Sequence, residues 1–409
     1  MADTTKVNKK QKDTLVYWTL LLLGFCTGLP WGVVTNSGPL FEERLKGTSY
    51  GDAFIPHFAT IFLLVKVVFL FISVNLLVSL RPHTQLITSV PLLSLAMLGF
   101  AFLCAIDFAS KLKFYVLVLA LSVLVSFFSA LFKAGNFGMV SVLPSLYLKA
   151  LFIGEAMSSV IMAFYSLVLG LAAIKAEKVQ TFATFGTASL SILLSVVAYS
   201  AVRRRPIFHH YQVKECDEET GDCEEKRKHE SIPALISHIL CQGLAAFLSG
   251  AVSLFIFSYL LSHTESMHPG SKFASRAVFR PLTLLIYPLG DLVGKMLPTW
   301  QFFNRPNLPL LQIVLARILL IPLFLLGNFQ VNGKNVFPLV FGSDVLFFVL
   351  VFTASVSGGY SSTMASVAVL KRVQHHDRGR ANTVIAAISL LGNLFGSMAS
   401  SVFAYIISH

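Results

Sequence analysis

Charged residues are scarce in this chain. Asp, Glu, Lys and Arg make up 13% of its 409 residues, about half of the roughly 25% that is typical of soluble domains. Hydrophobic residues make up 55%, and the mean hydropathy is +0.73. A chain with so little polar surface does not suit a soluble fold, so we predict an integral membrane protein with most of its mass in the bilayer.

Cysteines and catalytic motifs are also sparse. The five cysteines are too few and too scattered for a disulfide framework, and Cys216 and Cys223 have no histidine near them at zinc-finger spacing. The sequence has no Gly-x-Ser-x-Gly elbow, no His-Glu-x-x-His and no phosphate-binding glycine loop. We therefore predict a protein that is not an enzyme and that uses no cofactor and no metal. The first apolar run is too long for a cleavable signal peptide and should remain as an anchor.

The net charge of +12 lies mainly in short loops between apolar runs. Such placement sets membrane topology and favours contact with lipid head groups. It does not form the concentrated patch of a protein that binds a nucleic-acid polymer. We expect membrane lipid as a partner and no nucleic-acid polymer.

Apolar runs long enough to cross roughly 30 Å of hydrocarbon predict an all-α polytopic protein with about 11 transmembrane helices. They lie at about 14–37, 55–80, 85–106, 114–139, 144–173, 180–202, 233–262, 276–299, 308–330, 338–370 and 382–407. The sizeable polar stretch at 203–232 carries both signs of charge and predicts a flexible linker. It separates a helical bundle of six spans at 14–202 from one of five spans at 233–409, and residues 1–13 form a short tail.

Orientation follows from the basic residues in the loops. They are densest in the tail, in the linker and in the loop that begins at Lys371-Arg372. Because basic loops stay in the cytoplasm, we predict that the N-terminus and the 203–232 linker are cytoplasmic. An odd number of spans leaves the C-terminus outside.

Charged residues inside the apolar runs are the strongest functional signal. Asp291 and Lys295 are one helical turn apart, so they can pair on one helix face. Either they form a structural ion pair between helices, or they line a substrate path, which is the default for charge inside a membrane. Further candidates at membrane depth are Lys66, Lys133, Glu155, Arg317 and Asp344.

Leu29-Pro30-Trp31 lies in the middle of the first span. One interpretation is a kink with a packed aromatic ring. The other is an indole face that is exposed at the kink, where it can stack on a planar ligand.

Five different motifs lie one after another along the predicted spans. They are Gly28-Leu29-Pro30-Trp31; Lys133-Ala134-Gly135-Asn136-Phe137-Gly138 with Leu143-Pro144; Asp291-Leu292-Val293-Gly294-Lys295; Leu315-Ala316-Arg317 through Pro322-Leu323; and Ser357-Gly358-Gly359-Tyr360 with Asp344 upstream. In this order they resemble the equilibrative nucleoside transporter family over nearly the whole chain. The resemblance implies a major-facilitator-like fold that moves nucleosides or nucleobases without ATP, by facilitated diffusion or, in some members, with protons.

The chain departs from the family pattern at charged positions. Lys295 stands where the family has Arg, which keeps the charge but loses the planar fork. Lys133 aligns with a Gln that the family commonly uses to read the base, and Glu155 aligns with the Gln of a Gly-Gln-Gly stretch. We predict that Lys133 and Glu155 pair across two spans. The alternative is a protonated Glu155 in an apolar setting, which would suit proton coupling.

These observations predict a nucleoside or nucleobase transporter that works by alternating access. Trp31 would stack on the base, Asp291 would accept hydrogen bonds from sugar hydroxyls, Lys295 would keep Asp291 ionised, and Lys133 and Glu155 would line the base end of the site. Structural or gating roles are expected for Leu29, Pro30, Arg317, Asp344 and Gly359.

Two alternatives remain. One is a major-facilitator-like carrier of another small polar solute, and the other is a non-transporting sensor or scaffold. The short tail has no acidic dileucine element of the kind that lysosomal relatives carry. We therefore favour the plasma membrane over an endolysosomal membrane.

Overall fold

The structure is a computed structural model of the whole chain. It describes residues 13–48, 54–79, 81–106, 110–171, 178–205, 230–261, 264–266, 276–304, 309–331, 334–335, 337–338, 340 and 342–408. Residues 1–12 of the predicted tail and 206–229 of the predicted linker lie outside this part.

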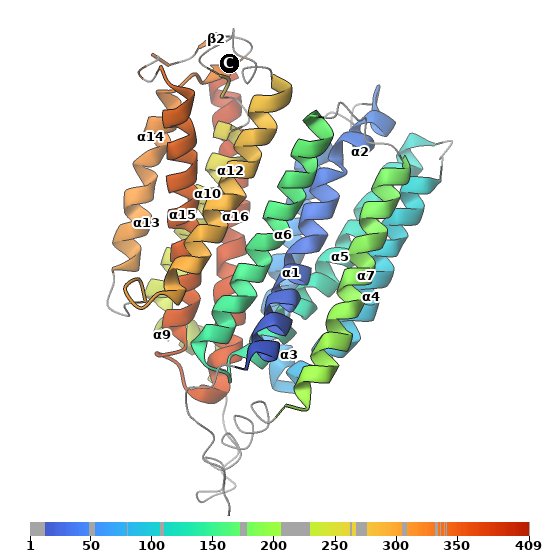
Figure 1. Cartoon of the computed structure of the whole chain (residues 1–409), viewed down its shortest axis with the longest axis vertical. Coiled ribbons are helices and arrows are strands. Elements are labelled where there is room, and N and C mark those ends of the chain that lie inside the picture. The colour runs from blue at the N-terminus through green and yellow to red at the C-terminus, as the bar shows by residue number, and fades with distance from the viewer. Residues whose placement is uncertain are drawn as a thin grey trace, which may run out of the picture.

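The described chain folds into a bundle of long, roughly parallel helices (Figure 1). Those of the first half are α1 (Thr14–Asn36), α2 (Gly38–Leu45), α3 (Phe54–Ser79), α4 (Pro82–Ala105), α5 (Lys111–Val140), α6 (Ser145–Leu171) and α7 (Lys178–Arg203). Those of the second half are α9 (Ile232–His238), α10 (Leu240–Phe255) with a π-helical turn (Ile256–Leu260), α12 (Arg276–Met296) with a 3₁₀ turn (Leu297–Thr299), α13 (Leu310–Ile318), α14 (Leu320–Leu325), α15 (Asp344–Val369), a 3₁₀ turn (His375–Asp377) and α16 (Arg378–Ser408). Two short strands, β1 (Gln330–Val331) and β2 (Lys334–Asn335), pair antiparallel.

Local signals explain where several helices begin. The Asp13 side chain accepts hydrogen bonds from the backbone N–H groups of Leu15 and Val16 and so caps α1. Pro82 opens α4 at a position where its missing N–H is not needed. The Ser110 hydroxyl caps α5 in the same way as Asp13 caps α1.

Nine helical segments of the described residues are long and apolar enough to cross a membrane, and they confirm nine of the predicted spans. The predicted eighth span is α12, whose 21 residues would reach about 31 Å. It is less apolar than the others because it carries four charged side chains, at Arg276, Arg280, Asp291 and Lys295.

The predicted ninth span is not one continuous helix, because α13 ends at Ile318 and α14 begins at Leu320. Pro322 explains the interruption, since its ring clashes with the carbonyl four residues earlier, that of Ile318.

Helices of one half pack mainly with each other. In the first half α1 packs on α6 and α7, and α4 packs on α5 and α7; in the second half α10 packs on α16, and α12 packs on α15. The halves meet where α12 contacts α6 and where α16 contacts α3 and α5. Leu70, Ala130, Ala134 and Ala387 form one of the apolar clusters that join them.

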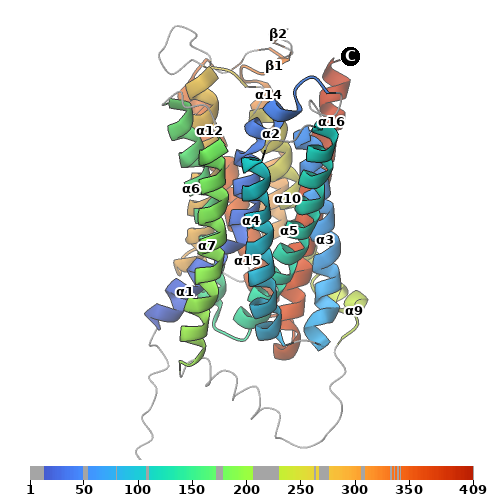
Figure 2. The same ribbon diagram turned by 90° about the vertical axis from the view of Figure 1, so that its right-hand side faces the viewer.

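The two ends of the bundle differ. Figures 1 and 2 place α2, the β1–β2 hairpin and the C-terminal end of α16 at one end, which we call the α2 end. The start of α1, the end of α7 and α9 lie at the other, which we call the α9 end. The described residues that flank the predicted linker are therefore on the same side as the start of α1.

Candidate functional site

A cavity of about 910 Å³ lies between the two halves. Trp31, Lys133, Glu155, Asp291 and Lys295 all line it. They come from α1, α5, α6 and α12, so the structure brings the five residues predicted to bind substrate to one cavity. The volume falls within the range of small-molecule sites, roughly 300–1,000 Å³.

One wall carries an ion pair between α5 and α6. Lys133 Nζ lies 2.7 Å from Glu155 Oε1, which confirms the predicted pairing. Lys133 Nζ also lies 5.8 Å from the centre of the Phe137 ring. The Lys133 side chain is 9% exposed and that of Glu155 is 25% exposed, so the carboxylate remains accessible from the cavity.

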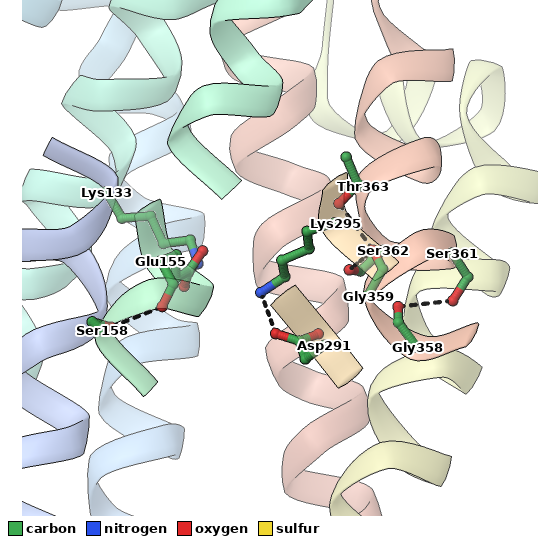
Figure 3. Close-up of polar contacts among 10 residues, drawn as sticks. All are labelled: Lys133, Glu155, Ser158, Asp291, Lys295, Gly358, Gly359, Ser361, Ser362 and Thr363. Atoms are coloured by element: carbon green, nitrogen blue, oxygen red, sulfur yellow. Dashed lines mark hydrogen bonds and ion pairs between the residues drawn. The ribbon is translucent and has the colours of Figure 1, made fainter. Parts of the chain in front are cut away.

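The facing wall carries the second ion pair, within α12. Lys295 Nζ lies 2.8 Å from Asp291 Oδ2, and the Asp291 side chain is 25% exposed. This contact confirms the pairing that the four-residue spacing predicted. Figure 3 shows the two pairs opposite each other, and Lys295 is near enough to Glu155 to interact with it electrostatically.

Close helix packing fixes the position of Asp291. A Cβ atom at Gly359 of α15 would overlap the backbone oxygen of Asp291 and lie 2.9 Å from its Oδ1. A Cβ atom at Gly294 would likewise overlap the backbone oxygen of Val356. Glycine at these positions lets α12 and α15 approach closely and holds the carboxylate against α15.

Trp31 belongs to an aromatic wall. It follows Pro30 within α1, and its ring lies 5.2 Å from that of Phe62 and 6.2 Å, nearly parallel, from that of Phe58. Both phenylalanines are on α3, and Phe58 also lines the cavity. Trp31 is therefore both packed and exposed to the cavity, which combines the two interpretations of the sequence. Leu29 is buried at 4% exposure.

Arg317 of α13 joins three helices behind the cavity. It is 2% exposed and donates to the hydroxyls of Ser249 and Ser253, each at 2.8 Å. It also donates to the backbone oxygens of Ser249 on α10 and Ala354 on α15, each at 3.2 Å. This geometry suits a structural role, which is one of the two roles, structural or gating, expected for Arg317.

Asp344 is not at membrane depth, so that prediction is wrong. It is the first residue of α15, at the α2 end, and its Oδ2 accepts a hydrogen bond of 2.7 Å from the Ser266 hydroxyl. An acidic residue is stabilised at this position by the helix dipole.

Rows of polar residues, most of them small, complete the lining, and these rows were not predicted from the sequence. Ser389, Asn393, Ser397 and Ser401 follow one another at four-residue spacing along α16. Shorter rows lie on the other helices, at Glu155 and Ser159 of α6, Ser249 and Ser253 of α10, and Ser362 and Ser366 of α15. The four-residue repeat of polar residues was visible in the sequence and predicts one wet helix face.

The lining reaches the α2 end, where Glu42 of α2, Arg280 of α12 and Ser400 of α16 belong to it. At the α9 end the two halves contact each other. Lys149 Nζ of α6 donates to the backbone oxygen of Pro298 at 2.7 Å.

A second contact at the α9 end joins α16 to the first half. Arg380 Nε of α16 donates to the backbone oxygen of Val74 of α3 at 3.4 Å. Arg380 also pairs with Asp377 at 2.7 Å. Gly379 lies directly against Gly138 and Ser141 of the first half.

A comparison with known protein families decides the assignment. A family model described as Nucleoside transporter matches residues 119–409. The chain belongs to the nucleoside transporter family. This family consists of membrane transporters and not of enzymes, and the chain is a multi-pass membrane protein.

Curated relatives align with this member of the nucleoside transporter family over almost the whole length of the chain. Equilibrative nucleoside transporter 2 of Homo sapiens is 24% identical, and the alignment covers 95% of this chain and 96% of the relative. Equilibrative nucleoside transporter 3 of Rattus norvegicus is 24% identical, with 94% of this chain and 89% of the relative covered.

Solved structures show that the fold is major-facilitator-like. The proton:xylose symporter XylE of the major facilitator superfamily superposes with a TM-score of 0.60 at 13% identity, covering 95% of this chain and 87% of that one. A mutant of the nucleoside transporter NupG superposes with a TM-score of 0.55 at 13% identity, covering 95% and 92%. The chain is thus an all-α polytopic membrane protein with this architecture.

Proposed function

We propose that this protein carries nucleosides or nucleobases across a membrane by alternating access, in a facilitative manner. The observation that carries the proposal is the cavity between the halves, in which an aromatic wall adjoins two ion pairs. Such a site can bind a planar ring and a polyhydroxylated sugar together.

The five lining residues have distinct roles in this proposal. Trp31 presents its ring to the base, and Lys133 and Glu155 bound the base end. Asp291 accepts hydrogen bonds from sugar hydroxyls through the carboxylate oxygen that Lys295 leaves free. Lys295 keeps Asp291 ionised and oriented.

Leu29, Pro30, Arg317 and Gly359 support this site without contacting the solute. Leu29 and Pro30 set the path of α1 around Trp31, and Arg317 ties α10, α13 and α15 together behind the cavity. Gly359 gives Asp291 its place beside α15.

Facilitated movement is supported by the ion pair at the base end. Glu155 lies 2.7 Å from Lys133, and an ionised carboxylate in such a pair is not poised to carry a proton. The test is uptake of labelled adenosine, uridine and hypoxanthine by proteoliposomes, with and without a pH gradient. Uptake in the absence of a gradient supports facilitation. Uptake that needs the gradient would restore the proton-coupled alternative, and no uptake of any of the three would reject the function.

The N-terminus and the 203–232 linker are proposed to be cytoplasmic. The described residues next to them lie at the α9 end, together with the basic residues Arg81, Arg203, Lys371 and Arg372. In this orientation the cavity reaches the outside, which corresponds to an outward-facing state. Cysteine labelling at positions 220 and 268 in intact cells should report opposite faces of the membrane, and labelling of both from outside would reject this topology.

The plasma membrane is the proposed location. The support is the tail, which has no acidic dileucine element. Fluorescence microscopy of a C-terminally tagged chain tests it, and signal confined to acidic internal compartments would overturn it.

A further inference from the structure

Asn393 of α16 is the one amide side chain among the described residues that line the cavity. It is partly exposed, and within the described part of the chain its amide makes no hydrogen bond. Several lining serines differ in this respect, because the hydroxyls of Ser355, Ser362 and Ser401 donate to backbone oxygens of their own helices. An amide offers two donors and one acceptor in a single plane, so Asn393 reaches the cavity with this capacity unused.

The side of α16 that faces lipid does not include Asn393. Exposed apolar residues mark that side, at Leu391, Phe395, Met398 and Val402. Asn393 is two residues from Leu391 and two from Phe395, which is about 200° of helix rotation. It therefore lies on the opposite face of the helix, and its exposed part borders the cavity.

Gly250 of α10 leaves room for the amide. A Cβ atom at Gly250 would lie 2.9 Å from Asn393 Oδ1 and would overlap the backbone oxygen of Ser389. Glycine at this position lets α10 and α16 approach closely. Gly250 itself lines the cavity, so the amide lies where the contact between the two helices meets the cavity and not behind it.

Asn393 lies at the depth of the aromatic wall. Its helix packs on α3 of the first half, and Leu70 of α3 and Ala387 of α16 share one apolar cluster. The α2 end holds the start of α3 and the end of α16 (Figures 1 and 2). Phe62 is eight residues from Leu70 toward that end. Asn393 is six residues from Ala387 toward it, so at 1.5 Å per residue the two differ by only about 3 Å in depth.

A base in the site would present its edge at this depth. Trp31 packs against Phe62, so a ring that stacks on Trp31 lies at the level of Asn393. The edges of bases carry neighbouring donors and acceptors, such as the amino group and N7 of adenine, and an asparagine amide can bind such an edge at two points. A purine without the exocyclic group offers one point fewer.

We propose that Asn393 binds the edge of the base and thereby determines specificity. The protein then favours bases that carry an exocyclic amino or oxo group over bases that lack one. The proposal rests on the proposed transport function and names a specificity residue for the same site.

Uptake of three nucleosides by proteoliposomes that contain the full chain tests the proposal. Adenosine, inosine and purine riboside share the ribose and the ring frame, and only the first two carry a group at C6. In the wild type we expect a KM for purine riboside at least about fivefold above that for adenosine or inosine, because one hydrogen bond is missing. Asn393→Leu keeps a similar size and cannot form hydrogen bonds, so it should bring this KM ratio close to one.

A second variant and a matched control accompany this change. Asn393→Ser continues the row of serines on the same face of α16 and is too short to bind an edge at two points, so the KM ratio should fall in the same way. Gln312→Leu is the control, because Gln312 is an exposed amide on α13 outside the lining, and it should leave the ratio unchanged. Thermal stability of each purified variant verifies that it is folded.

Three results would overturn the inference. The first is a wild-type KM ratio near one, or a ratio that both Asn393 variants leave unchanged while uptake persists; the transport function then stands without this role of Asn393. The second is a change confined to the KM ratio of 2′-deoxyadenosine to adenosine, which would assign Asn393 to the sugar. The third is a folded wild-type protein that takes up none of the three nucleosides, in which case the proposed function is rejected as well.

Discussion

Replacement of Lys133 and Glu155 by glutamine, singly and together, offers the sharpest test of the site. Each single change leaves one charge without its partner in the cavity wall, and breaking a buried ion pair in this way costs about 3–5 kcal/mol. The Glu155 side chain is 25% exposed, so water in the cavity can offset part of the loss. We therefore expect the lower end, about 3 kcal/mol, or roughly a 100-fold loss of transport at 1.36 kcal/mol per tenfold.

The double variant should lose much less. Two glutamine amides can form a neutral hydrogen bond worth about 1 kcal/mol, and neither residue then leaves a charge behind. We expect a coupling of about 2 kcal/mol between the two changes, within the range of contacting residues. Initial rates of nucleoside uptake in proteoliposomes measure the functional cycle, and the thermal stability of the detergent-purified variants measures the structural one.

A control cycle uses Lys133→Gln with Lys149→Gln. Lys149 contacts Pro298 at the α9 end and has no contact with the pair, so these two changes should add within about 0.5 kcal/mol. Equal, additive losses in the Lys133 and Glu155 cycle would show that the 2.7 Å contact carries no energy. A pH dependence of uptake that disappears in Glu155→Gln alone would show that Glu155 carries a proton.

Three further changes test other parts of the site. Asp291→Asn leaves Lys295 without its partner and should reduce transport at least about tenfold at normal surface expression. Near-normal uptake would show that Asp291 is not a site residue. If the protein were a sensor and not a transporter, the change would have no effect on uptake. Trp31→Ala should raise KM for nucleosides about tenfold, since base stacking on an aromatic ring contributes about 1–3 kcal/mol. Trp18→Ala is the control, because Trp18 lies on an exposed surface of the same helix, and it should leave KM unchanged. Equal effects of the two changes on KM would argue against stacking. Arg317→Lys should lower the melting temperature of the purified protein, because a single ammonium group cannot reproduce hydrogen bonds to two helices, and an unchanged melting temperature would show that these bonds do not stabilise the bundle.

Much of the fold followed from composition and the length of the apolar runs. Nine predicted spans became apolar helices because each must satisfy its backbone hydrogen bonds internally. The sequence was less informative at α12, where four charged residues lower the hydropathy, and at Pro322, where one predicted span became two helices. Such interruptions depend on local backbone geometry, which mean hydropathy does not record.

The site was predicted in part. Both ion pairs were foreseen, one from the spacing of Asp291 and Lys295 and the other from the departures of Lys133 and Glu155 from the family pattern. Asp344 was misplaced, because its distance along the chain did not show that α15 begins there. The serine rows were overlooked, since a hydroxyl costs little in a helix and does not stand out among apolar residues as a charge does.

The contact between Gly379 and Gly138 at the α9 end has a consequence for the rate of the transport cycle. Gly379 meets the Cα of Gly138 and the hydroxyl of Ser141 there, and no apolar side chain is among these nearest atoms, so separation of this one contact exposes little apolar surface. At about 25 cal/mol per Å², this contact by itself adds only a small barrier to the opening of that end. A carrier must pass repeatedly between two states of similar free energy, so at this end the cost of opening falls on the other contacts between the halves, such as the hydrogen bonds of Lys149 and Arg380.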